Sequence, residues 1–366
     1  MDIKEVKKLN VKYNGKIVGY LAELKNGSIA FQYDDEWIKN GFSISPISLP
    51  LSNEIYVNHE PTFNGLYGVF WDTLPDGWGE LLVRRMLNKN SINFDRLSPL
   101  QKLSIINKNG LGALEYEPNH ALKTKIAGYD LDELAKEAEK VLNDETDGVN
   151  LDTIYNLGGS SGGARPKAHI IYKGDEWIVK FPCSVDPKDI GEKEYTANSL
   201  ARNCEIHTNE FRLFDSKICS GYFGAKRFDR TINGKVHVIS LVALLETTHR
   251  IPNLDYGHLF AVINKISVDR NNDLYEAYRR MCFNVFYKNS DDHGKNFAFI
   301  YDEKLKGYRL SPAYDLTSLP NKPRHEMSVN GNDIPTENDL LAIAKEFKLS
   351  PQRCKNIIDD IKLKLI

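Results

Sequence analysis

The sequence predicts an α+β protein with two lobes, in which a β-rich half precedes a mostly helical half. The first residues alternate apolar and polar side chains around an Asn-Gly turn. The middle of the chain contains short strand patterns around a glycine-rich stretch at 158–163, and the apolar spacing beyond Asp255 is mostly helical. At about 150 residues per domain, 366 residues allow two to three domains.

The first half contains hairpin and helix signals. Asn14-Gly15 stands between the alternating segments 11–13 and 16–20, which predicts a β-hairpin. Another strand is expected at 29–33. Helical spacing predicts helices over 78–87, after a Pro-Asp-Gly turn, and from Leu131 to Leu142.

The glycine-rich stretch is followed by strands and then by helices. Strands are predicted at 167–172 and 177–181, around a Lys-Gly-Asp-Glu turn, and a helix at 192–203. Short strands are expected near Phe211 and Phe223, and an apolar strand around 236–244. Loops are expected at 289–296 and 310–319, next to apolar segments.

The composition excludes several classes of protein. With 48 basic and 50 acidic residues the net charge is -2, so no bulk basic field indicates direct nucleic-acid binding. The longest apolar runs, such as 238–245, are too short to cross a bilayer, and the first residues are too charged for a signal peptide. The five cysteines are scattered without a CxxC pair. We therefore expect a cytoplasmic protein with reduced thiols, and neither a membrane partner nor a zinc site.

The glycine-rich stretch is the first candidate for chemistry. Four glycines within six residues allow the backbone to approach a ligand closely, and successive N–H groups can hold phosphate oxygens. It is not a Walker A loop, because no GK[ST] follows. A flexible turn, with Ser160 and Ser161 as solvated loop residues, is the alternative.

Lys180 is the second candidate, because a lysine inside the apolar strand WIVKF needs a partner if it is buried. An edge position, with the amine reaching solvent, is the alternative. The order of glycine loop, strand, turn and strand with lysine is the phosphate-binding layout of protein kinases. The helix that follows supplies Glu192 or Glu194 as the glutamate that pairs with such a lysine, although either could lie on the surface.

Two polar segments complete the pattern. Asp291 and Asn296 have the spacing of the kinase catalytic loop, in which the aspartate accepts the hydroxyl proton and the asparagine binds a metal. His293 between them is interpreted as a structural histidine. Asp315 follows a strand at 308–310, where kinases place a metal-binding aspartate, although a turn-capping aspartate is the alternative. The HRD and DFG motifs of ordinary protein kinases are absent.

Seven segments in chain order resemble the HipA family of toxins, the kinase component of bacterial type II toxin–antitoxin systems. They cover roughly residues 10–330. The segments are WDTLPDGWGELLV, LSPLQKLSIINKNGLGALEY, GGSSGGARPKAHI, WIVKFP, FGAKRFDR, NSDDHGKNFAF and LSPAYDLTS.

The resemblance implies an ATP- and magnesium-dependent serine/threonine kinase with a two-lobed kinase-like fold. Asp291 would be the catalytic base, Asn296 and Asp315 the metal ligands, and Ser160 or the adjacent Ser161 the autophosphorylated residue. The residues that would contact the nucleotide, from the phosphate loop, the strand lysine, the hinge beside adenine and the catalytic segments, are Gly162, Gly163, Ala164, Arg165, Pro166, Lys167, Lys180, Ile239, Ser240, Leu241, His293, Lys295, Asn296, Tyr314 and Asp315.

The resemblance also implies partners and a division of the chain. Members of the family phosphorylate aminoacyl-tRNA synthetases, and a helix-turn-helix antitoxin neutralises many of them on operator DNA, which the kinase would reach only through that antitoxin. We expect a β-rich N-terminal subdomain at 1–115, the rest of the N-lobe with the phosphate loop at 116–255, and a helical C-terminal lobe at 256–366. Asp292 stands where glycine or another residue is common in the family.

Other classes of function remain open from the sequence. A catalytically silent HipA-like corepressor would bind partners without turning over ATP. A small-molecule or lipid kinase could share the same layout, because a fold does not determine the substrate.

Overall fold

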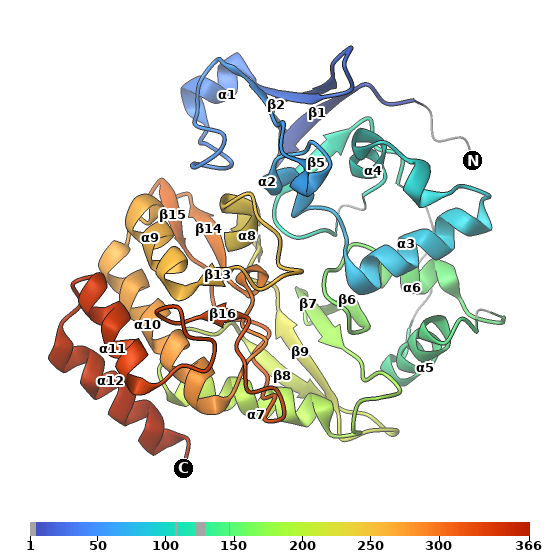
Figure 1. The fold of residues 1–366 in the computed structure, drawn as a ribbon. Helices are drawn as coiled ribbons and strands as arrows, with labels where there is room; N and C mark the ends of the chain where they lie inside the picture. Colours follow the sequence, from blue (N-terminus) through green and yellow to red (C-terminus); the bar gives the residue numbers. More distant parts are fainter. Residues whose placement is uncertain (1–4, 107–108, 122–128, 146) are drawn as a thin grey trace. The chain divides into compact units, whose positions relative to one another are not determined.

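The computed structural model describes residues 5–106, 109–121, 129–145 and 147–366. By its internal contacts the chain divides into two compact units, each described here by itself. Unit 1 comprises residues 1–192 and 211–237, and unit 2 comprises residues 193–210 and 238–366. Figure 1 shows the helices and strands of both units.

Unit 1 begins with an antiparallel five-stranded sheet in the order β4-β3-β2-β1-β5. Its strands are β1 (Lys8–Tyr13), β2 (Lys16–Glu23), β3 (Ile29–Tyr33), β4 (Ile55–Val57) and β5 (Leu114–Glu117). The helices between β3 and β5 are α1 (Asp35–Asn40), α2 (Gly68–Trp71), α3 (Gly77–Lys89) and α4 (Pro99–Ser104), with 3-10 turns at Pro61–Phe63 and Phe94–Arg96.

The predicted hairpin is confirmed as β1 and β2, because the turn between them uses the residues that such a turn needs. Asn14 and Gly15 have φ values of 45° and 82°, and a two-residue turn of the primed type requires a positive φ at both positions. The predicted strand at 29–33 is confirmed as β3, and the helix predicted over 78–87 lies within α3.

A second antiparallel sheet in unit 1 has the order β6-β7-β9-β8. Its strands are β6 (Lys167–Tyr172), β7 (Asp175–Lys180), β8 (Phe211–Phe214) and β9 (Tyr222–Lys226), and a small hairpin of β10 (Arg230–Thr231) and β11 (Gly234–Lys235) follows. Helix α5 (Leu131–Leu142), the predicted one, and α6 (Leu151–Gly158) precede the sheet, and α7 (Ile190–Asn203) follows β7 and continues into unit 2.

The core beside this second sheet is built from helices and strands distant in sequence. Helix α3 packs against α6, and α6 packs against β6, as Figure 1 shows. Trp78, Tyr155 and Val179 are buried in this cluster. The packing fixes α3, α6 and β6, which are the elements that surround the glycine-rich stretch.

A buried ionic cluster, the Arg227 cluster, connects the segment before β5 to the end of β9. It comprises Arg227, Asp229 and Arg230. The guanidinium of Arg227 donates to both carboxylate oxygens of Asp229 and to the carbonyl oxygens of Asn109 and Gly110. Asp229 also accepts from the Arg230 guanidinium.

The two arginines keep the carboxylate of Asp229 ionised. Burial favours the protonated form of a carboxylate, but the arginines outweigh this effect and lower the pKa of Asp229 to about 2. The cluster therefore stays charged and joins the two sheets of unit 1.

Unit 2 contains most of α7, a small sheet, a pair of short strands and five further helices. The sheet β12 (Val238–Ser240), β14 (Ala298–Asp302) and β15 (Gly307–Leu310) is antiparallel, and β13 (Leu254–Asp255) pairs in parallel with β16 (Met327–Ser328). The helices are α8 (Leu241–Leu244), α9 (Tyr256–Ile266), α10 (Arg270–Tyr287), α11 (Glu337–Glu346) and α12 (Pro351–Lys364), with a 3-10 turn at Gly294–Asn296. The helical second half predicted from the sequence is confirmed.

One predicted element is wrong in its second half. The apolar strand expected around 236–244 ends at Ser240, and residues Leu241–Leu244 form α8 instead. The Ser240 hydroxyl accepts from the amide of Ala243, so this serine caps the helix. Because residues Leu241–Leu244 are all buried, their periodicity gave no sign of the change.

The division of the chain into 1–115, 116–255 and 256–366 stays a prediction. Among the described residues, no helix combines the length and the apolar character needed to cross a bilayer.

Replacing the charge at the centre of the Arg227 cluster should destabilise unit 1. Asp229→Asn keeps an acceptor for the amide of Gly112, which donates to this side chain, but leaves two buried guanidinium groups without their main partner. We expect the free energy of unfolding to fall by about 3 kcal/mol or more, measured by urea denaturation.

A matched control is Asp175→Asn, which removes a carboxylate from a pair with Lys226 whose side chains are 47% and 31% exposed. This change should cost less than about 1 kcal/mol. Equal losses for the two variants would contradict a special role for the buried cluster.

Candidate functional site: a phosphate loop and a catalytic loop

In unit 1, the glycine-rich stretch lies against the first turn of α3. A side chain at Gly77 would come within 2.4 Å of the Gly163 carbonyl oxygen, and one at Gly79 within 2.1 Å of the Ser161 carbonyl oxygen. Gly77 also has a φ of 48°, in the region that favours glycine. The Gly-Trp-Gly sequence at the start of α3 therefore permits a close approach of the two backbones.

Hydrogen bonds hold the stretch in this position. Asp76 is the N-cap residue of α3 but does not cap its own helix; its carboxylate instead accepts from the amide of Gly163. The amide of Trp78 donates to the Gly163 carbonyl oxygen at 2.9 Å, and the Trp78 indole donates to the Lys167 carbonyl oxygen at 3.0 Å. The Lys167 ammonium donates to the Gly162 carbonyl oxygen. The loop is thus anchored at both of its ends.

The two candidate modification sites are buried in this conformation. Ser160 is 6% exposed and Ser161 is 4% exposed. Ser161 donates its hydroxyl to the Gly158 carbonyl oxygen. The Ser160 hydroxyl has no hydrogen-bond partner among the described residues. Neither hydroxyl is accessible to a second molecule while the loop is docked.

Lys180 lies beside the end of the phosphate loop. It is the antiparallel partner of Lys167 in the β6–β7 pair. The next amide, that of Phe181, donates to the Pro166 carbonyl oxygen at 2.8 Å. The Lys180 ammonium lies 5.8 Å from the centroid of the Phe223 ring. Unit 1 therefore brings the glycine loop and this lysine to one end of one sheet.

One further contact in unit 1 and one difference in burial along α7 concern other predicted residues. Arg165, within the loop, forms an ion pair of 3.0 Å with Asp186. Of the two candidate glutamates on α7, Glu194 is buried and Glu192 is exposed. Which of the two glutamates pairs with a lysine stays a prediction.

In unit 2, the catalytic loop is held together by its own side chains. The side-chain amide nitrogen (Nδ2) of Asn296 donates to the backbone carbonyl oxygen of Asp291 at 2.8 Å. This bond fixes the Asn296 side chain and leaves its amide oxygen as the group available to a ligand. The hydroxyl of Tyr314 donates to the carbonyl oxygen of Lys295 at 2.7 Å, which connects the catalytic loop to the segment containing Asp315.

Asp292, the residue after Asp291, anchors the loop through buried contacts. It is 1% exposed. Its carboxylate accepts from the Tyr256 hydroxyl at 2.8 Å and from the Glu326 amide at 3.1 Å, and pairs with the His325 ring at 2.8 Å. Burial and this carboxylate raise the pKa of Tyr256 well above its usual value. Asp292 is therefore a structural residue, and Asp291 beside it is the partly exposed one.

His293 of the loop and the predicted hinge at Ile239–Leu241 are further candidate residues that the structure describes. The Nδ1 atom of His293 is buried and has no hydrogen-bond partner among the described residues, so the interpretation as a satisfied structural histidine does not hold for this atom. Ile239, Ser240 and Leu241 are at most 1% exposed, and the Leu241 amide donates to the Phe297 carbonyl oxygen. They lie just after the boundary between the units at 237/238.

The residues present fit the implied nucleotide and metal. Asn296 and Asp315 offer an amide oxygen and a carboxylate, which are ligands of the hard kind that Mg²⁺ prefers. Asp315 has a φ of 57°, in the left-handed region that aspartate adopts more readily than most residues other than glycine. In unit 1, Gly163 has a φ of 79°, as expected of a loop that approaches phosphate with its backbone.

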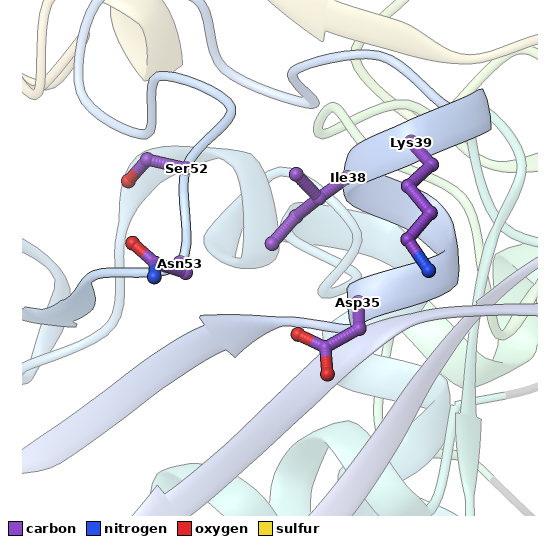
Figure 2. A pocket seen from close by; sticks show the side chains of 5 residues that line it. All are labelled: Asp35, Ile38, Lys39, Ser52 and Asn53. Atoms are coloured by element: carbon purple, nitrogen blue, oxygen red, sulfur yellow. The ribbon is translucent and has the colours of Figure 1, made fainter.

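Two hollows in the described part of the chain differ in their relation to the predicted residues. The open depression in Figure 2 lies between α1 and the segment before β4, and its lining residues include none of the predicted site residues. They are Asp35, Ile38, Lys39, Ser52 and Asn53. A small, more enclosed cavity in unit 2 lies below the catalytic loop and is lined by Asp292, Asn296 and Tyr314 among others.

The predicted residues thus form two groups. Unit 1 brings together Gly162–Lys167, both serines and Lys180, whereas unit 2 brings together the loop from Asp291 to Asn296 and the Tyr314-Asp315 pair. Sequence reasoning missed the anchors, which are Asp76, Trp78, Asp292 and His325. For Asp76 and Trp78 the available signal was the pair of glycines in the first turn of α3. Glycine is a poor helix former, so two of them there indicate that another backbone packs close.

Removing the Asp76 carboxylate should loosen the phosphate loop. A hydrogen bond to a charged group contributes about 1.5–3 kcal/mol. Asp76→Ala should therefore raise the equilibrium constant for opening of the loop about tenfold or more. Hydrogen exchange of the peptide covering 158–167, followed by mass spectrometry, measures this opening.

Glu80→Gln is the matched control, because it removes a carboxylate one turn later on α3 that pairs with Arg84 of the same helix. Its exchange in 158–167 should equal that of the unaltered protein. If Asp76→Ala exchanged no faster than this control, the Asp76 bond would not hold the loop.

Comparisons with known proteins agree with this arrangement. Family models match residues 9–117, as the HipA N-terminal domain, and residues 159–365, as the HipA-like C-terminal domain. Two curated proteins of Sinorhizobium fredii NGR234 are similar. "Putative kinase Y4mE" is 24% identical over 352 residues, 86% of this chain and 77% of that protein. "Putative kinase Y4dM" is 30% identical over 159 residues, 40% of this chain and 38% of that protein.

A solved structure shares the fold. It is the HipA of Shewanella oneidensis MR-1, in complex with HipB and operator DNA, with a TM-score of 0.72 and 19% identity. The similarity covers 96% of this chain and 88% of that one. The α+β fold predicted from the sequence is thereby confirmed, as is the family predicted from its motifs. Because the two family models together span most of the chain, the protein belongs to the HipA family and has its kinase-like fold.

Proposed function

We propose that the protein is an ATP- and magnesium-dependent serine/threonine protein kinase. The observation that carries this proposal is the bond from the Asn296 side chain to the backbone of Asp291, at the spacing of a kinase catalytic loop. It leaves the Asp291 carboxylate and the Asn296 amide oxygen available for separate tasks. Two curated relatives named as kinases support the same reaction class.

The reaction transfers the terminal phosphoryl group of ATP to a hydroxyl group of a protein. The hydroxyl oxygen forms a bond to the γ-phosphorus, the bond from that phosphorus to the β–γ bridging oxygen breaks, and ADP leaves with the electron pair. Asp291 orients the hydroxyl group and takes its proton. Asn296 and Asp315 would hold magnesium, whose charge would offset that of the phosphates.

The phosphate loop and Lys180 bind the nucleotide in this proposal. The backbone of Gly162–Lys167 supplies N–H groups, and Lys180, at the same end of the sheet, supplies a positive charge. Because the Gly163 amide already donates to Asp76, ATP has to displace this carboxylate or use the neighbouring amides.

The proposed partners follow from the family. We propose a helix-turn-helix antitoxin as a binding partner, supported by the solved HipA that is in complex with HipB and operator DNA. An aminoacyl-tRNA synthetase is the proposed protein substrate. A net charge of -2 fits a kinase that meets DNA only through its antitoxin.

Asp291→Asn tests the proposed base. Its loss should lower the rate of phosphoryl transfer by about 100-fold or more, whereas the dissociation constant of ATP should change by less than about threefold, because Asp291 does not hold the nucleotide. Radiolabel transfer from [γ-³²P]ATP in the presence of magnesium and a cell extract measures the rate.

The control is Asp333→Asn, since Asp333 is also 43% exposed and ion-paired, with Arg324. It should transfer label at the unaltered rate. Label in small molecules or lipids instead of proteins would identify a different kinase class, and no transfer by the unaltered protein would contradict the proposed function.

Autophosphorylation at Ser160 or Ser161 should switch the enzyme off. A phosphate adds a charge of about -1.5 to -2, which cannot stay in the buried positions of these hydroxyls, so the loop has to leave its docked position. We expect the modified fraction to bind ATP at least about tenfold more weakly.

Mass spectrometry after incubation with ATP and magnesium locates the phosphate, and Ser160→Ala and Ser161→Ala separate the two residues. Nucleotide titration of the modified and unmodified fractions then compares their affinities. Equal affinities would contradict the switch.

A further inference from the structure

A lysine outside every predicted site contacts the proposed catalytic base. The ammonium nitrogen of Lys322 lies 3.5 Å from the Asp291 carboxylate and also bonds to the carboxylate of Glu326. Lys322 is 31 residues beyond Asp291 in the sequence, so this contact results from the fold and not from the local sequence.

The segment that contains Lys322 is fastened to the catalytic loop. The amide of Glu326 donates to the Asp292 carboxylate at 3.1 Å and to the Ser290 carbonyl oxygen at 3.2 Å, and the His325 ring pairs with Asp292. Immediately afterwards, Met327–Ser328 pairs as β16 with β13. The residues on either side of Asp291 therefore hold the 322–326 segment in register with the base.

The contact is charged and open to solvent. The side chains of Lys322 and Asp291 are 39% and 43% exposed. Partial burial disfavours the ammonium form, but the carboxylates of Glu326 and Asp291 outweigh it and raise the pKa of Lys322. An ion pair this exposed contributes little to stability, so the segment is held by Glu326 and His325, and Lys322 is available to influence Asp291.

We propose that Lys322 is a positioning residue for phosphoryl transfer, which holds the carboxylate of Asp291 in place and offsets negative charge at the catalytic loop. This inference rests on the proposed kinase function. A carboxylate that must receive a proton from a hydroxyl group acts efficiently only in a narrow range of positions. A nearby fixed positive charge also reduces the repulsion between the acidic groups of this loop and the phosphates of a nucleotide.

The role predicts a separation of kinetic effects. Lys322 acts on the base and not on the nucleotide, so Lys322→Gln should lower kcat by about tenfold or more, whereas KM for ATP should change by less than about twofold. Lys322→Arg keeps the charge and should recover most of the rate. In an Asp291→Asn background, Lys322→Gln should have less than about a twofold further effect, because the group through which it acts is gone.

The experiment measures ³²P transfer by the full-length protein, with thermal unfolding of each variant as a check on folding. Lys355→Gln is the matched control, since Lys355 is 45% exposed and bonds to two carboxylates, those of Glu337 and Asp359. It should keep the unaltered rate.

The outcomes separate this inference from the function on which it rests. If the unaltered protein transfers phosphate, Asp291→Asn does not and Lys322→Gln keeps a normal kcat, the positioning role alone is overturned. The role would also be overturned if Lys322→Gln and Lys322→Arg lowered kcat equally. The same holds if Lys322→Gln lowered kcat by the same factor in the Asp291→Asn background as in the unaltered protein. An unaltered protein that transfers no phosphate overturns both proposals.

Discussion

The buried carboxylate of Asp292 is the interaction on which the loop at 290–296 in unit 2 depends. The loop after α10 has no strand or long helix to hold it, and its ends alone would not fix the orientation of Asp291. By accepting from Tyr256 and Glu326 and pairing with His325, Asp292 joins three segments at one point. Its neighbour Asp291 is left at the surface, so one aspartate supplies rigidity and the next is available for chemistry.

In unit 1, the glycine-rich loop is fixed by close backbone packing instead. A loop rich in glycine has a large conformational entropy to lose, and docking on α3 reduces this freedom before any ligand arrives. The contact needs Gly77 and Gly79, because any larger residue there would collide with the loop. The Asp76 carboxylate completes it by accepting from an amide of the loop itself.

Much of this architecture could be predicted from the sequence. The hairpin at Asn14-Gly15, the strand β6 and the helix α5 follow from local patterns that the fold does not override. The turn into α8 was missed because a buried strand and a buried helix have the same uniformly apolar sequence. The order of the candidate residues was readable, but their anchors were not, since Asp76 and Gly163 are 87 residues apart and the Asp292–His325 pair spans 33. Contacts over such separations depend on how the chain packs.

The Arg227 cluster has a consequence for how unit 1 responds to a partner. Its guanidinium groups bond to the backbone just before β5 and to the strands of the second sheet, so moving the N-terminal sheet away would leave buried guanidinium N–H groups without their carbonyl acceptors. Displacing the first sheet would therefore cost several buried hydrogen bonds at once, so a partner that bound this sheet would meet a surface secured to the rest of unit 1.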